Sequence, residues 1–240
     1  NLPNLENGAM YYAISYATDG TDVWYGDAVA ILVEEPEFAG GDGSQEDPYQ
    51  VSIPFHLNSI RNYLDACFIQ TADIDLTAAC AEGGDYWNDG AGWLPIGDYD
   101  TRFTGTYDGQ GYTISGMMIN RATSYIGLFG CTDNAEITDV TLEDCSMVDS
   151  TANNCGALAG YVYYSSISQC SSSGTINGNY SVGGLVGYCL GNTTEFVDCV
   201  NYGTVQGTSL VGGLIGQVQS YSGIHSCVSQ GSVTGSSQVG

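Results

Sequence analysis

The hexapeptide Val182-Gly183-Gly184-Leu185-Val186-Gly187 occurs again, with one substitution, as Val211-Gly212-Gly213-Leu214-Ile215-Gly216. Looser copies of this glycine phrase lie at 155–160 and, one residue shorter, at 126–130. The closing glycines of the copies are 30, 27 and 29 residues apart. This near-constant spacing indicates an internal repeat in the second half of the chain.

A second phrase, which begins with a cysteine, follows each of the last three glycine phrases. Its copies begin at Cys170, Cys199 and Cys227, which are 29 and 28 residues apart. Two phrases that share one period are hard to obtain by chance. The period of about 28 residues therefore predicts a repeated structural unit.

Each unit has short β-prone runs separated by Gly, Ser, Asn or Thr, without the periodicity of a helix. Such a unit suits one coil of short strands, and stacked coils pair equivalent strands in parallel. We therefore predict an all-β fold: a parallel β-solenoid with a short N-terminal capping helix, preceded by a β-hairpin. The glycines of the phrase are expected at tight corners, where positive φ and the lack of Cβ are needed.

Equivalent side chains of successive coils should stack in ladders. One inward ladder is predicted at Cys170, Cys199 and Cys227, and another three residues earlier at Ile167, Phe196 and Ile224. A redox or metal stripe is the alternative for the cysteines, but a column without His or an acidic partner favours buried thiols. The nine cysteines include no C-x-x-C pair, which also favours thiols over a zinc site.

Charge limits the partners of the chain. Its 240 residues include 27 acidic residues, three arginines and no lysine, for a formal net charge of -24. Nucleic acid is excluded as a partner because phosphate binding depends on Lys and Arg, and anionic lipid is excluded on the same grounds. No run approaches the ~20 apolar residues of a membrane helix, so direct membrane insertion is not expected.

The N-terminal part differs from the repeats. Residues 1–37 are predicted to contain a β-hairpin with strands at 11–17 and 23–33, because an Asp-Gly step between β-rich runs favours a turn. Residues 38–120 are predicted to hold a linker, a capping helix and the first coils. The helix is predicted from the spacing of four apolar residues, Ile53, Leu57, Ile60 and Leu64.

Residues 121–240 are predicted to form the repeats. The final residues, Val239 and Gly240, begin a further copy of the glycine phrase. No capping segment follows, and the N-terminal hairpin lacks partner strands. Both ends are therefore expected to be cut from a longer protein.

An ordered series of motifs precedes the glycine phrases, at 40–44, 47–51, 70–76, 93–97 and 103–114. With the repeats, this series resembles the GLUG-repeat proteins, which are bacterial or archaeal surface proteins. The resemblance covers roughly residues 39–240. Residues 5–11, with Tyr11 at the position of a tyrosine corner, resemble the last strands of a fibronectin type III or immunoglobulin-like domain.

The resemblance implies secretion, surface attachment and a place in large modular proteins such as adhesins or immunoglobulin-A-cleaving metallopeptidases. It implies no catalytic site in this chain. An H-E-x-x-H motif is absent, and the two histidines, His56 and His225, lie far apart in the sequence.

Clustered carboxylates raise the alternative of polysaccharide cleavage, because such enzymes also use β-helices and need paired carboxyl groups. The candidates are Asp73, Asp75, Asp98, Asp100 and Asp108, with Arg102 or Arg121 as a basic partner. Hydrogen bonds in turns explain these carboxylates more simply. No catalytic or cofactor-binding residue is therefore predicted. A structural calcium ion stays open, at Asp98-Tyr99-Asp100 or within 85–89, because carboxylates are its usual ligands.

Aromatic residues are the other candidates for a binding surface, since aromatic rings stack on sugars and anchor interfaces. Stacking within the core is the favoured alternative. In the run of tyrosines from Tyr161, a strand would place neighbours on opposite faces, so at least one should be exposed. The candidates are Tyr86, Trp87, Trp93, Tyr161, Tyr163, Tyr164, Tyr180, Tyr188 and Tyr202.

These observations predict a non-enzymatic, extracellular module of the cell surface that acts in adhesion or as a rigid spacer in a larger protein. Its expected partners are other surface-protein domains, glycans, or proteins of a host or neighbouring cell. The alternative is a structural subunit that self-associates end to end into filaments, because open coils offer strand edges. A polysaccharide-processing enzyme is the third possibility.

Overall fold

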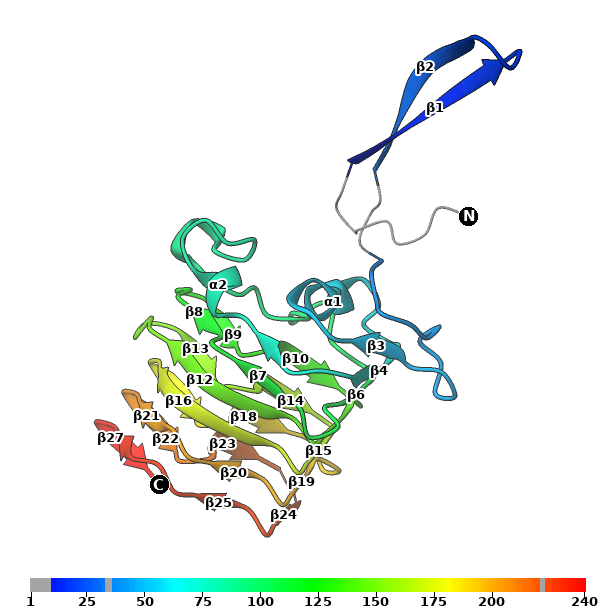
Figure 1. The fold of residues 1–240 in the computed structure, drawn as a ribbon. Helices are drawn as coiled ribbons and strands as arrows, with labels where there is room; N and C mark the ends of the chain where they lie inside the picture. The colour runs from blue at the N-terminus through cyan, green and yellow to red at the C-terminus, as the bar shows by residue number, and fades with distance from the viewer. Residues whose placement is uncertain (1–9, 33–35, 221–222) are drawn as a thin grey trace. The chain divides into compact units, whose positions relative to one another are not determined.

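The computed structural model describes residues 10–32, 36–220 and 223–240. The chain divides into two compact units, Asn1–Glu37 and Phe38–Gly240. The second unit consists of stacked coils whose strands pair in parallel (Figure 1). The predicted all-β class and the parallel β-solenoid are confirmed.

The first unit is an antiparallel hairpin of β1 (Met10–Thr18) and β2 (Val23–Leu32). Its turn is held by Asp19, whose carboxylate accepts hydrogen bonds of 2.9 Å from the backbone N–H groups of Thr21 and Asp22. The strands match the predicted runs, with Val33 outside the described residues. The tyrosine-corner resemblance also falls mostly outside them, since residues 1–9 are not described.

The second unit begins with a cap around β3 (Tyr49–Val51) and α1 (Pro54–Ser59). The predicted capping helix exists but is short, because it changes to the 3-10 turn η1 (Ile60–Asn62). Leu57 and Ile60 are fully buried, whereas Leu64 follows the helical segment and only packs against the core. The cap continues through β4 (Cys67–Gln70), β5 (Ile74–Asp75), α2 (Thr77–Cys80) and the 3-10 turn η2 (Asn88–Gly90).

The coils follow, and each contributes strands to the same parallel sheets. The first contains β6 (Thr106–Asp108), β7 (Thr113–Ser115), β8 (Met118–Ile119), β9 (Ser124–Ile126) and β10 (Phe129–Asp133). The next two contain β11 (Glu136–Thr138), β12 (Thr141–Met147), β13 (Asn153–Cys155), β14 (Ala159–Tyr163), β15 (Ser166–Ser168), β16 (Ser171–Asn177), β17 (Tyr180–Gly183) and β18 (Val186–Leu190). The last contain β19 (Glu195–Val197), β20 (Val200–Asn201), β21 (Thr204–Gln206), β22 (Ser209–Gly212), β23 (Ile215–Gln219), β24 (Gly223–His225), β25 (Val228–Ser229), β26 (Val233–Thr234) and β27 (Ser237–Val239).

The strand register reproduces the sequence period. In the four-stranded sheet β10-β14-β18-β23, Phe129 pairs with Ala159, Ala159 with Val186, and Val186 with Ile215. These steps of 30, 27 and 29 residues equal the spacing of the closing glycines. One sequence repeat is therefore one coil.

The predicted ladders stack inside the coils. Ile167 pairs with Phe196, which pairs with Ile224, and both Ile167 and Phe196 are fully buried. Cys170 and Cys199 are also buried, and burial raises the pKa of Cys170 well above its ordinary value. The ladder opens at the last coil, where Ile224 is 47% exposed. All nine cysteines are free thiols, of which seven are buried, whereas Cys67 and Cys227, the last member of the predicted ladder, are only partly buried.

The expected positive φ of the phrase glycines is wrong. Left-handed conformations occur instead at non-glycine residues. Each strand of the five-stranded sheet β27-β22-β17-β13-β9 has one such residue at an equivalent position: Tyr125, Asn154, Ser181, Leu210 and Gln238. The glycines are needed for space: a Cβ on Gly187 would lie 2.4 Å from the carbonyl carbon of Asn154. A Cβ on Gly160 would lie 2.3 Å from that of Tyr125. Close backbone approach, and not glycine's conformational freedom, explains the phrase.

Candidate functional site

Alternation along the strands of the four-stranded sheet brings tyrosines together on its outer face. Tyr161 and Tyr163 are two residues apart on β14, and so project on the same side. Tyr161 pairs in register with Tyr188 on β18. Because equivalent strands of neighbouring coils pair in register, the tyrosines form a patch that extends from one coil to the next.

The rings of this patch stack on one another. The ring centroids of Tyr161 and Tyr188 are 5.3 Å apart with an interplanar angle of 25°, and those of Tyr161 and Tyr163 are 6.1 Å apart. Tyr99, from the loop before β6, stacks on Tyr125 at 5.6 Å and on Tyr161 at 6.3 Å. Offset stacking at these distances is favourable and holds the rings in fixed positions.

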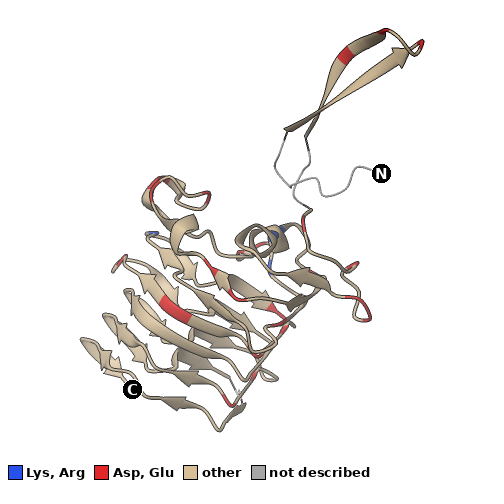
Figure 2. Cartoon of the chain, in the orientation of Figure 1, with Lys and Arg blue, Asp and Glu red and all other residues tan. Residues whose placement is uncertain are grey.

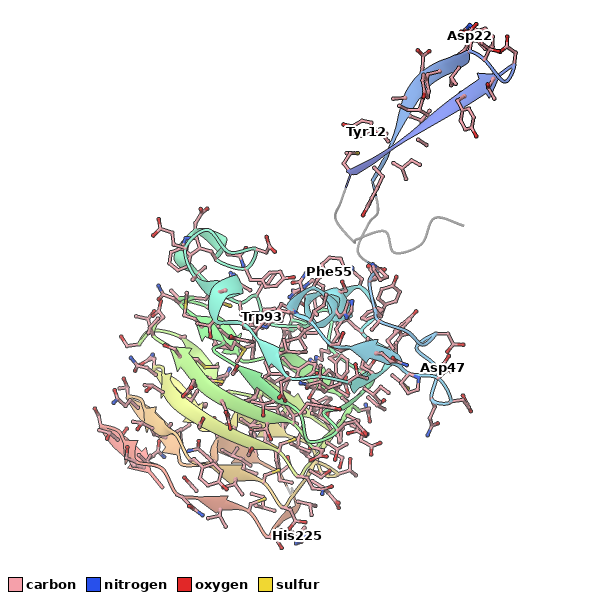
Figure 3. All side chains as sticks on the ribbon, in the orientation of Figure 1. Tyr12, Asp22, Asp47, Phe55, Trp93 and His225 are labelled. Atoms are coloured by element: carbon pink, nitrogen blue, oxygen red, sulfur yellow. The ribbon has the colours of Figure 1, made fainter. Side chains whose placement is uncertain are left out.

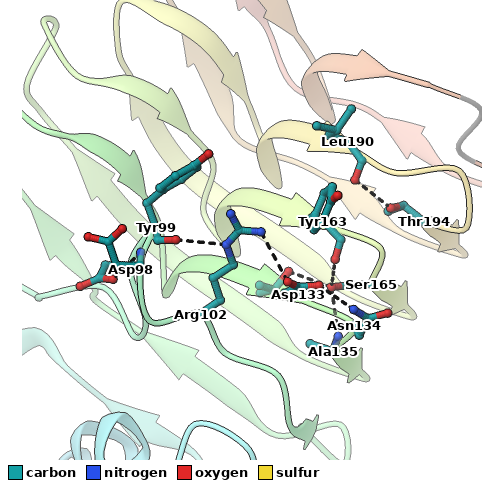
Figure 4. A network of polar contacts seen from close by, with 12 residues as sticks. Asp98, Tyr99, Arg102, Asp133, Asn134, Ala135, Tyr163, Ser165, Leu190 and Thr194 are labelled. Carbon is teal, nitrogen blue, oxygen red and sulfur yellow. Dashed lines mark hydrogen bonds and ion pairs between the residues drawn. The ribbon is translucent and has the colours of Figure 1, made fainter.

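Arg102 holds one end of the patch in place (Figure 4). Its guanidinium carbon lies 4.8 Å from the ring centroid of Tyr99, 5.4 Å from that of Tyr161 and 5.2 Å from that of Tyr163. Its Nε donates to the carbonyl oxygen of Tyr99 at 3.2 Å, and its Nη1 lies 3.5 Å from Oδ2 of Asp133. A cation shared by three rings stabilises their arrangement.

Burial at the centre of the patch changes the acidity of Tyr161. Desolvation raises its pKa to about 12, although the charge of Arg102 acts in the opposite direction. The phenol therefore stays neutral at physiological pH and can both donate and accept a hydrogen bond.

Polar residues border the tyrosine patch: Ser124 on β9, Asn153 and Asn154 on β13, and Asn179 before β17. Asn179 Nδ2 donates to Asn153 Oδ1 at 3.2 Å, and Ser181 Oγ hydrogen-bonds with Gln217 Oε1 at 2.8 Å. The tyrosines and these polar residues line a groove of about 750 Å³, which we call the tyrosine groove. Its lining residues are Tyr99, Ser124, Tyr125, Asn153, Asn154, Tyr161, Asn179, Tyr180, Tyr188, Leu190 and Gln217.

The chemistry of the groove suits a polar ligand with apolar faces. Aromatic rings offer flat surfaces, while amide groups supply both donors and acceptors at fixed positions. None of the lining residues is charged. A sugar, which has hydroxyl groups around a ring with C–H faces, matches this combination.

The aromatic candidates separate into groups. Tyr161, Tyr180 and Tyr188 line the groove, whereas Trp93, labelled in Figure 3, is fully buried and donates from Nε1 to the carbonyl oxygen of Leu128. Tyr86 packs edge-on against Trp93 at 5.4 Å, and Trp87 lies nearby on the cap. Tyr202 is 56% exposed on another part of the surface.

The predicted alternation of the tyrosine run is wrong at its end. β14 ends at Tyr163, and Tyr164 has a left-handed conformation, so these two rings meet at 4.2 Å instead of pointing apart. None of Tyr161, Tyr163 and Tyr164 is fully exposed, because each ring covers another.

The candidate carboxylates serve separate turns. Asp73 accepts from the N–H of Thr113, Asp75 from that of Thr77, and Asp108 from that of Gln110. Asp98 accepts from the N–H groups of Asp100 and Thr101 at 2.9 and 2.7 Å, and the latter contact lowers its pKa. The lowered pKa of Asp75 and of Asp98 is opposite to the raised pKa that a general acid needs for glycoside cleavage. Residues 10–32, 36–220 and 223–240, which include both proposed calcium positions, contain no group of three or more His, Cys, Asp or Glu side chains that could hold a metal ion.

The glycine and cysteine phrases do not mark several residues of the groove. Tyr99 comes from an unrepeated loop, whereas Tyr125 on β9, Asn153 and Asn154 on β13, and Asn179 before β17 lie just before glycine phrases. That place before a glycine phrase was the available signal.

The fold and the groove define a parallel β-solenoid repeat protein with an aromatic surface groove. The family model of the GLUG motif matches residues 151–177, which confirms the resemblance to GLUG-repeat proteins. The match covers β13 to β16, which is close to one coil. One coil of the solenoid therefore carries a GLUG motif.

Two relatives share longer segments. The chain is 42% identical over 131 residues to a protein of Evansella cellulosilytica that is provisionally named a Gly-rich membrane protein, a match to 52% of this chain and 14% of that protein. It is 37% identical over 155 residues to halomucin of Haloquadratum walsbyi, a match to 61% of this chain and 2% of halomucin. The chain thus spans a small part of the length of these relatives.

A solved structure shares the fold. It comes from Bacteroides ovatus, is provisionally described as an immunoglobulin A1 protease, and superposes with a TM-score of 0.58 at 19% identity. The superposition covers 85% of this chain and 73% of that one. Among the described residues of the present chain, no helix is long and apolar enough to cross a membrane.

Proposed function

We propose that this chain is a non-enzymatic module of an extracellular surface protein and that it binds glycans along the tyrosine groove. The observation that carries the proposal is the groove itself, which is lined by both stacked tyrosine rings and asparagine side chains. The names of the two relatives, a membrane protein and halomucin, support a place at the cell surface. A stack of coils would also hold the groove at a fixed distance from neighbouring domains.

Substitution in the groove tests the proposal. We expect Tyr188→Ala to weaken binding to immobilised oligosaccharides about 10-fold, because an aromatic contact contributes about 0.5–1.5 kcal/mol and the ring also supports Tyr161. Tyr202→Ala is the matched control, since Tyr202 is exposed outside the groove. Equal loss in both variants, or no binding to any glycan on a broad panel by the unaltered protein, would refute the proposal.

The enzymatic alternative has its own test. A polysaccharide-cleaving protein would release reducing ends or unsaturated sugars from acidic polysaccharides, and Asp108→Asn would stop that release. We expect no release from either protein, since Asp108 is engaged in its own turn with Gln110.

Self-association is the second candidate. In the described residues, the apolar side chains of Ile224, Val228 and Val239 are each 45–47% exposed. An unpaired parallel strand edge can accept a matching coil. Sedimentation across a concentration series distinguishes filaments from single solenoids.

A further inference from the structure

Two of the three cations of this acidic chain line one pocket. Arg61 on η1 and Arg121, between β8 and β9, both border a cavity of about 430 Å³. Figure 2 shows that basic residues occur only toward the capped end of the solenoid, whereas acidic residues are spread over both units. The pocket is lined by Arg61, Asn62, Leu64, Leu94, Pro95, Gly97, Asp98, Thr101, Arg121, Thr123, Ser124 and Tyr125.

Both guanidinium groups are fixed by backbone oxygens. Arg61 donates from Nε to the carbonyl oxygen of Asn58 at 3.0 Å and from Nη2 to that of Leu94 at 2.9 Å. Arg121 donates from Nε to the carbonyl oxygen of Trp93 and from Nη2 to that of Gly92, both at 3.0 Å. Arg61 also contacts Asn58 Oδ1 from Nε at 3.1 Å and the carbonyl oxygen of Pro95 from Nη1 at 3.5 Å. A guanidinium has five N–H donors, so each arginine retains N–H groups that these contacts do not use.

Neither charge is neutralised by a carboxylate. In the described part of the chain, the ion pair found is that of Arg102 with Asp133, not one of Arg61 or Arg121. Burial and the nearby charge of Arg121 lower the pKa of Arg61. Asp98 also borders the pocket, but its Oδ1 accepts hydrogen bonds from the N–H groups of Asp100 and Thr101 and from Thr101 Oγ1.

Two partly buried, fixed and unpaired arginines would be stabilised by a bound anion. Planar guanidinium groups bind carboxylate and sulfate oxygens through paired N–H donors. Ser124 and Tyr125 line both this pocket and the tyrosine groove, so the two sites adjoin. One ligand could place an anionic group against the arginines and its rings against the tyrosines.

We propose that Arg61 and Arg121 form an anion subsite that selects glycans carrying a carboxylate or sulfate group. This inference rests on the proposed function, because it assigns a ligand class to the same groove. The net charge of -24 repels acidic polymers at long range, but at physiological salt that repulsion is screened beyond about 8 Å. Contacts inside the pocket then decide the selectivity.

The test compares a uronic-acid oligosaccharide with its carboxyl-reduced counterpart by calorimetry in physiological salt. We expect the acidic form to bind at least 10-fold more tightly to the unaltered protein. Arg121→Gln should remove this preference, so that the variant binds the acidic and the reduced form with equal affinity. Equal affinities in the unaltered protein, or a preference that survives Arg121→Gln, would overturn the inference.

Two further measurements separate the possible failures. Arg121→Lys replaces Arg121→Gln if the latter fails to fold. It retains the charge but not the planar guanidinium, and we expect it to keep only part of the preference. Glucuronate and sulfate alone should shift the side-chain Nε–H resonances of Arg61 and Arg121, and the absence of any shift counts against the subsite. Binding of the reduced form without selectivity refutes only the anion subsite. Resonance shifts without oligosaccharide binding refute only the groove.

Discussion

At the residue scale, the left-handed residues Tyr125, Asn154 and Ser181 each lie against a glycine of the next coil. Asn154 has a φ of 53°, and a Cβ on Gly187 would lie 2.4 Å from its carbonyl carbon. Most L residues disfavour this conformation, because Cβ crowds the following carbonyl oxygen. The close approach of backbone atoms between neighbouring coils offsets this conformational cost.

We predict that Gly187→Ala destabilises the protein by about 3 kcal/mol, because the new Cβ would lie 2.4 Å from backbone atoms that cannot move aside. Gly240→Ala is the control, since a Cβ there meets no heavy atom within 4 Å. Urea denaturation measures both. A difference of less than 1 kcal/mol between the variants would contradict the role assigned to the glycine phrase.

The left-handed position gives a second residue-scale prediction. Gln169 is exposed and has φ of 53°, so Gln169→Val should destabilise the protein by about 1–2 kcal/mol, since a β-branched residue fits this region poorly. Gln206, exposed on β21, has an ordinary strand conformation, and Gln206→Val should be neutral or stabilising. Thermal melts that rank the two variants in the opposite order would show that side-chain chemistry, and not φ, determines the effect.

At the element scale, the coils are held together by their ladders and parallel pairing. Each coil contacts the coil before it and the coil after it, as in other solenoids, so stability depends on neighbouring interfaces. The ladder that contains Ile137, Ile167 and Phe196 runs through the centre of these interfaces, and all three residues are fully buried.

We predict that Phe196→Ala destabilises the protein by about 3–5 kcal/mol, because it leaves a cavity inside the stack. Ile224→Ala, at the next position of the same ladder, should cost less than about 1 kcal/mol, since Ile224 is 47% exposed. Hydrogen exchange should show lost protection in the coils beside Phe196 first. Uniform loss throughout the solenoid would indicate one cooperative unit.

At the scale of the whole molecule, charge opposes folding. A formal charge of -24 with three arginines creates self-repulsion that few ion pairs relieve. The same charge keeps the protein soluble and discourages contact with other acidic surfaces. The anion subsite would then be a local exception to a repulsive exterior.

Salt should therefore stabilise the protein. We expect the melting temperature to rise by several degrees between 0.01 and 0.5 M sodium chloride, because the Debye length falls from about 30 Å to a few ångströms. Potassium chloride at equal concentration is the control for a specific effect of sodium. An unchanged melting temperature would mean that repulsion between carboxylates contributes little to the free energy of unfolding.

The amino-acid sequence by itself determined the period, the coil and the register, since equal spacing of the glycine and cysteine phrases aligns each strand with its copy. It also predicted the buried ladders, because parallel pairing stacks equivalent residues. Only the tertiary structure placed Arg102 among three tyrosines, and Arg61 beside Arg121. The physical reason is that repeats encode contacts between neighbouring coils, whereas the contacts of Arg102 and the anion pocket join unrepeated loop and cap residues to strands that are distant in sequence.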